Sequence, residues 1–552
     1  MKKIILIFLL IYGNLFAQIQ TFENGVVSSA NEIASQAGIE ILKKGGNAID
    51  AAVCVGFTLA VVYPQAGNLG GGGFMVIHLK DGFNTSIDYR EKAPLLAGRD
   101  MYLDSNGNVI LNLSTLGNLA AGVPGSVAGM LYALEKYGTM NRNEILEYAI
   151  NLADTGFAIN KQLADNLNNY QKDFILFPET MKTFGGNFRE GNLLIQKDLA
   201  NTLKNIRDSG KDGFYKGEVA DKIVSEMNNT NGIISFDDLN KYDAKERNVV
   251  KGTYRDYEII SMGPPSSGGI SLIYLLNILE NYDLNINGYG SEKNIQLMTE
   301  AMRRVYADRS EFMGDADFVN VPADILTNKV YAERRMSDFT EGKASKSSEV
   351  KHGDAYYKES DQTTHYSVAD KFGNLVSVTT TLNDVFGNKV VVKDAGFFLN
   401  NEMDDFVSKP GVPNIYGLVG NEANSIFPEK RMLSSMTPTI ILKNNKPYLI
   451  VGSPGGGRII TSVLQTIINL IDYKMTLEDA VDSRRFHHQW LPEEIQAENN
   501  MFTNSVKNNL ENMGYAIKQI NDFGRVEAII FTEDGKMSGH SDRRGTGKSI
   551  GY

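Results

Sequence analysis

Residues 362–383 alternate in polarity on both sides of the turn-forming segment 370–374, and this pattern predicts a β-hairpin folded about Phe372. Successive side chains of a strand point to opposite faces of a sheet, so the hairpin sorts them into two sets. One face carries Tyr366, Val368, Val376 and Val378. The other face carries mostly hydroxyl side chains: Thr363, His365, Ser367, Ser377, Thr379 and Thr381. A bulge in the turn would shift the pairing by one residue and exchange the faces.

In this register Thr363 and Thr381 lie opposite each other, and a polar face of this kind suggests chemistry. A threonine that begins a chain can use its own α-amine, with a pKa of about 7.7 to 8, to remove the proton of its hydroxyl. Thr363 is internal, so the mechanism requires cleavage of the Gln362–Thr363 bond. The route is attack by the Thr363 hydroxyl on the Gln362 carbonyl, followed by hydrolysis of the ester. The competing interpretation is structural, because β-branched residues favour strands.

Further motifs follow one another along nearly the whole chain. With QTTHYSV at 362–368, they are KKGGNAIDAA at 43–52, NLGGGGF at 68–74, DYRE at 88–91, LNNEMDDF at 399–406, LSSM at 433–436 and GSPGG at 452–456. Together they resemble the γ-glutamyltransferases (γ-glutamyltranspeptidases), a family of N-terminal-nucleophile hydrolases. The resemblance implies an α+β fold, the four-layer αββα sandwich. It also implies one folded unit made of a large subunit, 18–362, and a small catalytic subunit, 363–552.

The resemblance also implies a role for each matching residue. Thr363 would be the nucleophile, Thr381 would orient it, and the Gly455 and Gly456 N–H groups would form the oxyanion hole. The α-carboxylate of a γ-glutamyl donor would be bound by Arg90, Ser434 and Ser435. Its α-ammonium would be bound by Asn383, Glu402 and Asp405, where some family members carry Gln in place of the glutamate. Tyr416 would gate a lid at 410–420.

The implied reaction is acyl transfer through a γ-glutamyl ester on Thr363, without a cofactor. Donors would be glutathione, glutamine and related γ-glutamyl compounds, and acceptors would be water, amino acids or peptides. The two subunits would form a heterodimer, and whether two heterodimers associate is left open. Asp384-Val385 and Asn388-Lys389 depart from the family pattern, which bears on acceptor preference more than on catalysis.

The residues themselves support parts of this assignment. The acidic cluster at 402–405 is flanked by Phe397-Phe398-Leu399 and Phe406, so it is expected to be partly buried and to need a cation. Arg90 at the end of a strand pattern is a candidate carboxylate fork, or else a structural partner of Asp88 or Glu91.

Two glycine-rich segments invite different interpretations. Gly455-Gly456-Gly457 follows a strand pattern and precedes a helix, where backbone N–H groups can face a negative charge. Gly70 to Gly73 precedes a strand and is not followed by Lys-Ser/Thr, so it predicts a close approach of two backbones rather than a phosphate loop.

Composition and the N-terminus limit the function classes. A net charge of −11 and a pI near 5.3 argue against a nucleic-acid or anionic-membrane partner. Lys2-Lys3, the apolar run 4–12 and Ala17 resemble a secretory signal at 1–17 that is too short to span a bilayer, which predicts export to the periplasm or the medium and no membrane span in the mature chain. Cys54, the sole cysteine, lies in an apolar stretch and is expected to be buried and inert.

Metal catalysis is not expected. The pair His487-His488 lacks a suitably spaced third ligand, and as neighbours on an expected helix they would face different ways. His365 is expected to be structural, because neighbours on the same face of a strand rarely meet in the line a Ser/His pair requires.

Periodicity predicts helices at 30–44, 48–62, 459–471 and from Thr476, and hairpins at 74–91, 438–452 and 527–539. The polar segment 341–362 is expected to be a mobile surface linker that ends at the proposed cut.

Two alternative functions are a related amidase, such as a cephalosporin acylase, and an exported amino-acid or peptide-binding protein without catalysis. Cleavage of glutaryl amides would favour the amidase. An intact Gln362–Thr363 bond with retained ligand binding would favour the binding protein.

Overall fold

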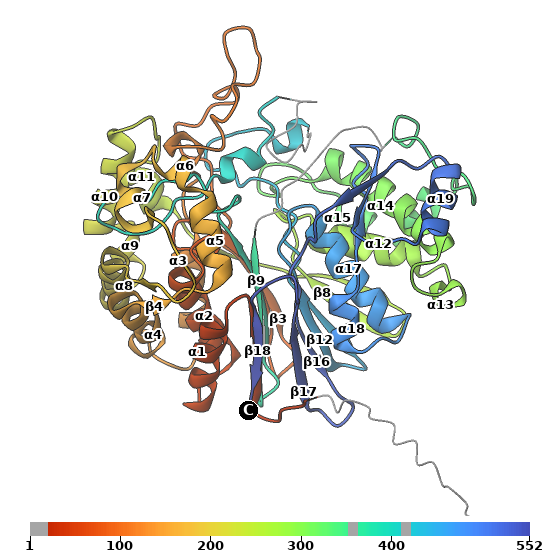
Figure 1. Ribbon diagram of the computed structural model, residues 1–552, viewed down its shortest axis with the longest axis horizontal. Helices are drawn as coiled ribbons and strands as arrows, with labels where there is room; N and C mark the ends of the chain where they lie inside the picture. The colour runs from red at the N-terminus through yellow and green to blue at the C-terminus, as the bar shows by residue number, and fades with distance from the viewer. Residues whose placement is uncertain (1–19, 352–362, 410–420) are drawn as a thin grey trace, which may run out of the picture.

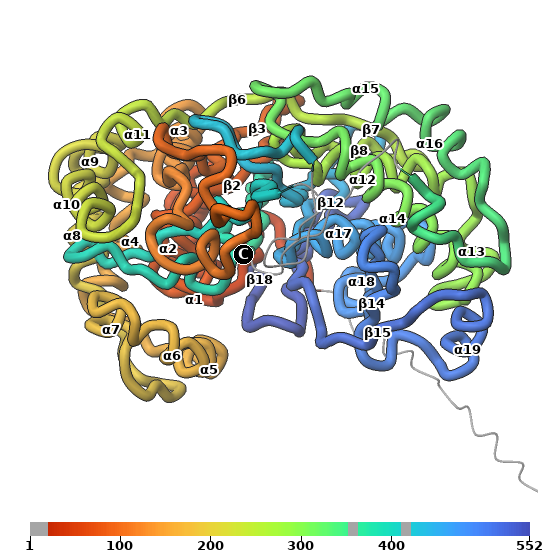
Figure 2. Tube along the Cα trace, turned by 90° about the horizontal axis from the view of Figure 1, so that it is seen from above, coloured from red at the N-terminus to blue at the C-terminus, as the bar shows by residue number. Residues whose placement is uncertain are grey.

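The computed structural model describes residues 20–351, 363–409 and 421–552. Two β-sheets are stacked at its centre and helices cover both outer faces, so the molecule has four layers (Figure 1). Seen from above, the two helical layers lie on opposite sides of the sheets (Figure 2). This is the αββα sandwich that the sequence predicted.

The first sheet has seven strands in the order β18-β1-β9-β10-β2-β3-β6. Their bounds are β1 Gly25–Ser29, β2 Gly72–His78, β3 Asn84–Asp88, β6 Lys245–Arg247, β9 Thr364–Asp370, β10 Leu375–Thr381 and β18 Lys548–Gly551. The β9–β10 pair is the hairpin predicted about Phe372. Every β9–β10 partner pair lies symmetrically about Phe372, from Leu375 opposite Ala369 to Thr380 opposite Thr364, so no bulge shifts the register.

The second sheet has six strands in the order β17-β16-β12-β11-β8-β7. Their bounds are β7 Val250–Tyr254, β8 Tyr257–Ser261, β11 Thr439–Lys443, β12 Lys446–Gly452, β16 Glu527–Phe531 and β17 Met537–Ser541. A two-stranded sheet pairs β4 Phe157–Ala158 with β5 Leu193–Leu194. In a three-stranded sheet, β14 Ile495–Glu498 pairs with β13 Phe486–His487 on one side and β15 Ile517–Ile520 on the other. Asn444 and Asn445 both have positive φ in the β11–β12 turn, as a two-residue hairpin turn requires.

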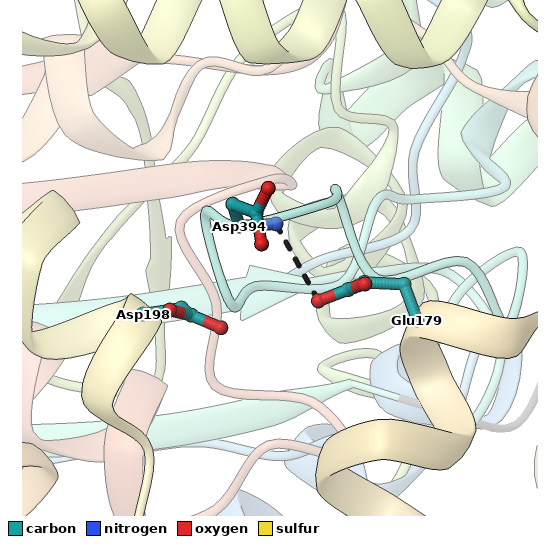
Figure 3. A group of neighbouring side chains, drawn as sticks. All are labelled: Glu179, Asp198 and Asp394. Atoms are coloured by element: carbon teal, nitrogen blue, oxygen red, sulfur yellow. Dashed lines mark hydrogen bonds between the residues drawn. The ribbon is translucent and has the colours of Figure 1, made fainter.

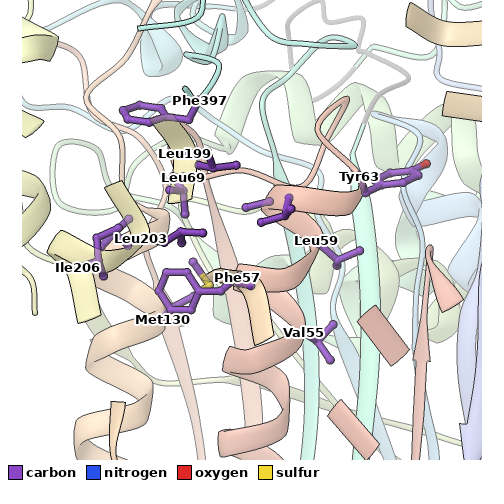
Figure 4. Close-up of a cluster of buried hydrophobic side chains, with 14 of the residues drawn as sticks. Val55, Phe57, Leu59, Tyr63, Leu69, Met130, Leu199, Leu203, Ile206 and Phe397 are labelled. Carbon is purple, nitrogen blue, oxygen red and sulfur yellow. The ribbon is translucent and has the colours of Figure 1, made fainter. Parts of the chain in front are cut away.

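Helices from the first half of the chain cover the first sheet. They are α1 Glu32–Lys43, α2 Ala48–Val62, α3 Ser126–Tyr137, α4 Arg142–Thr155, α5 Lys161–Asn169, α6 Gln171–Phe174, α7 Pro178–Phe184, α8 Lys197–Ser209, α9 Asp212–Tyr215, α10 Gly217–Asn228 and α11 Phe236–Lys241. Every residue of α2 is buried, and the helix starts at a capping box between Asn47 and Asp50. Its side chains pack against those of α8 and Met130 of α3 in the apolar core (Figure 4).

The other helical layer covers the second sheet. It comprises α12 Gly268–Leu279, α13 Leu284–Asn287, α14 Glu292–Phe312, α15 Ala323–Leu326, α16 Lys329–Arg335, α17 Arg458–Ile471, α18 Leu477–Asp482 and α19 Asn504–Asn512. The predicted helices at 459–471 and from Thr476 correspond to α17 and α18, and Thr476 caps α18 by accepting the Asp479 N–H. Within the described residues, no helix combines the length and apolar character needed to cross a bilayer.

The interface between the two sheets is polar at its centre. His365 contacts the Thr379 hydroxyl at 2.9 Å and the Ser367 hydroxyl at 3.1 Å. Ser367 donates to the Glu527 carbonyl of the second sheet, and Ser377 accepts the Thr439 N–H of that sheet. The hydroxyl face of the hairpin therefore mostly joins the two sheets. Apart from the two threonines at the ends of the hairpin, its hydroxyls have a structural role. The expectation that His365 and Ser367 would not meet was wrong, because both side chains face the second sheet, where the His365 ring lies against Gly452 of β12.

Both sheets contain strands from either side of the proposed cut. In the first sheet β9 lies between β1 and β10, and β10 lies between β9 and β2. In the second sheet β8 pairs with β11, which lies more than 170 residues later in the chain. A cut before Thr363 would therefore leave two chains bound by continuous hydrogen-bond ladders. This agrees with the expected single folded unit.

Candidate active site

The hairpin ends at Thr363 and Thr381. Continued by one residue, the β9–β10 register places Thr363 opposite Thr381, and both side chains are buried. The Thr381 hydroxyl accepts the N–H of Asn383 at 2.7 Å. Asn383 has a φ of 74°, a left-handed conformation that asparagine tolerates better than most residues, and this turns the chain toward the neighbouring acidic segment.

The glycines at 70–73 allow another segment to lie against the hairpin. A Cβ on Gly71 would be 2.1 Å from the Thr381 carbonyl oxygen, and one on Gly73 would be 2.4 Å from that of Thr379. Asn68 fastens the contact, since its Nδ2 donates to the Thr381 carbonyl at 2.8 Å and its Oδ1 accepts the Gly71 N–H at 2.9 Å. The predicted close approach of backbones is confirmed.

Arg90 lies just beyond β3 and its side chain is 1% exposed. Its Nη1 is 2.6 Å from a carboxylate oxygen of Glu402, and its Nη2 contacts Asp405. Nη2 also donates to the Leu433 carbonyl at 3.3 Å, next to Ser434. Arg90 thus joins the segments that were predicted to bind the two ends of an amino acid.

The structural alternatives for Arg90 do not describe its main contacts. Asp88 accepts the backbone N–H of Arg90, and its carboxylate pairs instead with Arg247 at 2.7 Å and Arg431 at 3.3 Å. Glu91 lies farther from Arg90 than Glu402 does, at 3.6 Å from Nη1.

Burial shifts the protonation of the acidic cluster. Desolvation raises the pKa of Glu402 well above its usual range, raises that of Asp405, and raises that of Glu91 to about 8, although Arg90 offsets part of each shift. Burial disfavours the guanidinium cation, yet Glu402 and Asp405 together raise the pKa of Arg90. The site holds one guanidinium among three carboxylates.

Thr381 lies between Thr363 and this cluster. A hydrogen bond from Thr381 lowers the pKa of Glu402, opposing the desolvation. Asn383 donates its Nδ2 to the Asn401 carbonyl at 3.0 Å, which leaves its Oδ1 as an acceptor. Thr381, Asn383 and Glu402 are therefore neighbours, as expected.

Ser434 and Ser435 are held by Ser267 and by Arg309 of α14, two residues for which no role was predicted. The Ser434 carbonyl accepts the N–H and the hydroxyl of Ser267, both at 2.8 Å. The Ser435 hydroxyl accepts Nη2 of Arg309 at 2.5 Å. The sequence did contain a sign of this role, because Arg309 is a charged residue in the apolar stripe of α14 formed by Met298, Met302 and Val305.

The glycine loop lies between β12 and α17, as predicted. Gly455 and Gly456 have φ values of 131° and 56°, which other residues rarely adopt. The Gly455 and Gly456 carbonyls accept the first N–H groups of the following turn, from Arg458 and Ile459. The hydroxyl of Tyr306 on α14 donates to the Gly457 carbonyl.

Two predicted site residues, Gln362 and Tyr416, lie outside the described residues, as do the lid 410–420 and the end of the linker. The described start of the predicted linker, 341–351, is held by hydrogen bonds rather than mobile. Trp490 Nε1 donates to the carbonyls of Ser347 and Val350, both at 2.9 Å. The two departures from the family pattern meet in an ion pair, with Lys389 Nζ 2.8 Å from Asp384.

The remaining histidine and cysteine candidates are structural. His487 lies in strand β13 rather than in the expected helix, and it contacts Thr461 at 2.9 Å and Gln489 at 2.6 Å. His488 accepts the Trp490 N–H, and burial lowers its pKa well below the usual range. Burial raises the pKa of Cys54 to about 12, so its thiol stays protonated.

One group of carboxylates among the described residues has ligand-like spacing. It consists of Glu179, Asp198 and Asp394 (Figure 3). Lys182 Nζ lies 2.9, 3.0 and 3.2 Å from these three side chains and supplies the positive charge that they need.

Comparison with known proteins relates the chain to one family. A family model described as gamma-glutamyltranspeptidase matches residues 34–552. The glutathione hydrolase proenzyme of Escherichia coli (strain K12) is 48% identical over 526 residues, which cover 95% of this chain and 90% of that protein. The crystal structure of Helicobacter pylori γ-glutamyltranspeptidase is 50% identical with a TM-score of 0.58, covering 59% of this chain and 94% of the solved one.

Cephalosporin acylase from Bacillus halodurans covers 97% of both chains with a TM-score of 0.84 at 24% identity, a likeness of fold alone. The family match extends over nearly all of the described chain and includes both ends of the hairpin, the acidic cluster and the glycine loop. The chain belongs to the γ-glutamyltranspeptidase family.

Proposed function

We propose that this protein is a proenzyme that cuts its own Gln362–Thr363 bond and then acts as a glutathione hydrolase and γ-glutamyltransferase. The observation that carries the proposal is the buried cluster of Arg90, Glu402 and Asp405 beside the paired threonines. This cluster holds a guanidinium and carboxylates together, which are the two charges needed to bind the head group of an amino acid.

Substrate choice follows from an exchange of ion pairs. Without a donor, Arg90 is neutralised by Glu402 and Asp405. The α-carboxylate of a γ-glutamyl donor would take the guanidinium, and its α-ammonium would take the two carboxylates, so every buried charge keeps a partner. A glutaryl donor has no ammonium and would leave the two carboxylates unpaired. The arrangement therefore favours γ-glutamyl donors over glutaryl donors.

Maturation would begin at the same threonine. The Thr363 hydroxyl attacks the Gln362 carbonyl, the amide C–N bond breaks, and the acyl group moves to the hydroxyl oxygen as an ester. Water hydrolyses that ester, releasing the Gln362 carboxylate and a free α-amine on Thr363. The interleaved strands keep the chains 18–362 and 363–552 in one unit.

In the catalytic cycle the free α-amine takes the proton of the Thr363 hydroxyl, whose oxygen attacks the γ-carbonyl of the donor. N–H groups of Gly455 and Gly456 stabilise the oxyanion. The γ-amide C–N bond then breaks, the amine leaves with the proton held by the α-amine, and a γ-glutamyl ester remains on Thr363. Water or the amine of an amino acid or peptide attacks this ester and restores the enzyme.

The cellular setting is part of the same proposal. Segment 1–17 would direct export and be removed, placing the enzyme in the periplasm or the medium. Donors would be glutathione, glutamine and other γ-glutamyl compounds, and Tyr416 would close over them. No cofactor takes part in any step.

The first test is a denaturing gel of the purified protein with N-terminal sequencing of each band. At the mean residue mass of the chain, cleavage gives pieces of about 38 and 21 kDa, and the smaller one begins Thr-Thr-His-Tyr-Ser. Thr363→Ala stays uncut. The processed protein should then release glutamate from glutathione and cleave L-γ-glutamyl-p-nitroanilide faster than glutaryl-p-nitroanilide.

Other outcomes would decide against the proposal. A single uncut band after prolonged incubation removes the α-amine base, and retained binding of glutamate would then indicate a binding protein. Efficient cleavage of the glutaryl amide in preference to the γ-glutamyl amide would indicate an amidase of the acylase type.

A further inference from the structure

Helix α14 (Glu292–Phe312) carries two side chains that bond to two different segments of the candidate site. Arg309 and Tyr306 are three residues apart, so they project from the same face of the helix. Arg309 reaches the predicted carboxylate-binding serines, and Tyr306 reaches the carbonyl of Gly457 in the glycine loop. The family resemblance assigned neither residue a role.

The guanidinium of Arg309 is 1% exposed and bonds to two serine hydroxyls. Nη2 donates to the Ser435 hydroxyl at 2.5 Å, and Nε donates to the Ser267 hydroxyl at 2.6 Å. Ser267 then donates its own hydroxyl and N–H to the Ser434 carbonyl. Arg309 therefore holds the side chain of Ser435 directly and the backbone of Ser434 through Ser267.

This geometry sets the direction of the Ser435 hydroxyl. A serine hydroxyl has one proton and two lone pairs. When a cationic N–H occupies one lone pair, the proton must point away from the guanidinium, and the oxygen is polarised so that its proton is a stronger donor. The charge of Arg309 also lowers the pKa of Asp405, so it acts within the same cluster as Arg90.

We propose that Arg309 is a positioning residue that makes Ser435 a hydrogen-bond donor to the α-carboxylate of the donor substrate. This inference depends on the proposed function, since it assigns a role within that site. Arg309 would act through Ser435 and Ser267 rather than on the reacting atoms. Its effect would appear only with substrates that have an α-carboxylate.

Three amide substrates distinguish this role from a general effect on the fold, because two of them each lack one charged group of the first. L-γ-glutamyl-p-nitroanilide has both charges, glutaryl-p-nitroanilide lacks the ammonium, and 4-aminobutyryl-p-nitroanilide lacks the carboxylate. In Arg309→Lys, kcat/KM should fall roughly 10- to 100-fold for the first two, mainly through KM, because one charge-assisted hydrogen bond is lost or displaced. For the third amide it should stay within about threefold.

Two variants on the same helix serve as controls. Arg303→Lys changes an equally buried arginine that bonds to Ser347 and Glu493 instead of the serines of the site, and it should affect all three amides alike. Tyr306→Phe loosens the glycine loop and should lower kcat for all three amides. If Arg309→Lys does not mature, Ser267→Ala tests the same arrangement through the backbone of Ser434.

The outcomes are distinct. Equal losses on all three amides in Arg309→Lys, or no loss on any, would overturn the inference while the proposed function stands. A wild-type protein that matures but does not cleave L-γ-glutamyl-p-nitroanilide would overturn the proposed function, and this inference with it. A loss confined to the two carboxylate-bearing amides supports both.

Discussion

Replacing both carboxylates that face Arg90, in Glu402→Gln/Asp405→Asn, should remove the preference for γ-glutamyl over glutaryl donors. In the wild type, at a pH where both carboxyls are ionised, a glutaryl donor takes Arg90 and supplies no ammonium, so Glu402 and Asp405 lose their nearest cation. Removing one partner of a buried ion pair costs about 3–5 kcal/mol. At about 1.4 kcal/mol per factor of ten, the expected preference is roughly 10² to 10⁴ in kcat/KM. In the double variant it should fall to about tenfold or less.

The preference should also depend on pH in the wild type alone. Burial raises the pKa values of Glu402 and Asp405, so at low pH these groups are neutral and a glutaryl donor leaves no charge unpaired. The ratio of the two kcat/KM values should therefore rise with pH as the carboxyls ionise. Titration of the Thr363 α-amine affects both donors and cancels in the ratio. In the double variant the ratio should be flat.

The assay compares initial rates on L-γ-glutamyl- and glutaryl-p-nitroanilide for matured wild type and variant across pH. Asp404→Asn is the matched control, because that neighbouring carboxylate accepts a hydrogen bond from Ser114 rather than from Arg90. Its donor preference should stay at the wild-type value. A double variant that matures and still prefers the γ-glutamyl donor by more than about 100-fold would refute the reasoning, since other groups would then be binding the ammonium.

Two further predictions concern stability. Burial raises the pKa of Glu527 to about 8, so between pH 4.5 and 8 the folded state holds a proton that the unfolded state has released, and stability falls by a few kcal/mol as pH rises. Urea unfolding of uncut Thr363→Ala should show this decline, and adding Glu527→Gln should reduce it, leaving the shares of Glu91, Glu402 and Asp405, whose pKa values burial also raises. An unchanged slope after this substitution would count against the prediction. Gly71→Ala should destabilise by about 3 kcal/mol or more and block maturation, because its Cβ meets the Thr381 carbonyl at 2.1 Å. Gly98→Ala, with no atom within 4 Å of its Cβ, should melt like the wild type.

The sequence predicted the elements that depend on local pattern. Helix α2 has the bounds predicted for it, because Asn47 caps its start and Tyr63-Pro64 follow its last residue. The β9–β10 register followed from alternation about a single turn, and hairpins at Asn444-Asn445 and Asp534-Gly535 followed from residues that tolerate positive φ. Periods of 2 and 3.6 residues are written into the chain itself.

The purpose of the hydroxyl face was harder to foresee. Alternation placed His365, Ser367 and Ser377 on one side of the hairpin but did not say what would cover that side. The cover is the second sheet, whose strands come from positions about 60 to 160 residues away, and its carbonyls and N–H groups pair with these hydroxyls. The hydroxyls between the two ends of the hairpin are therefore structural, and only the end threonines remain as candidates for catalysis.

Local periodicity and turn residues in the sequence predicted individual helices and hairpins, and its motifs predicted the family and the candidate residues. How those residues share charge depends on the tertiary structure. Arg90 pairs with carboxylates more than 300 residues away, and Arg309 reaches Ser435, more than 120 residues away. Such contacts have no period and no local signal, because they depend on where two stacked sheets bring distant loops together and on how burial shifts the resulting pKa values.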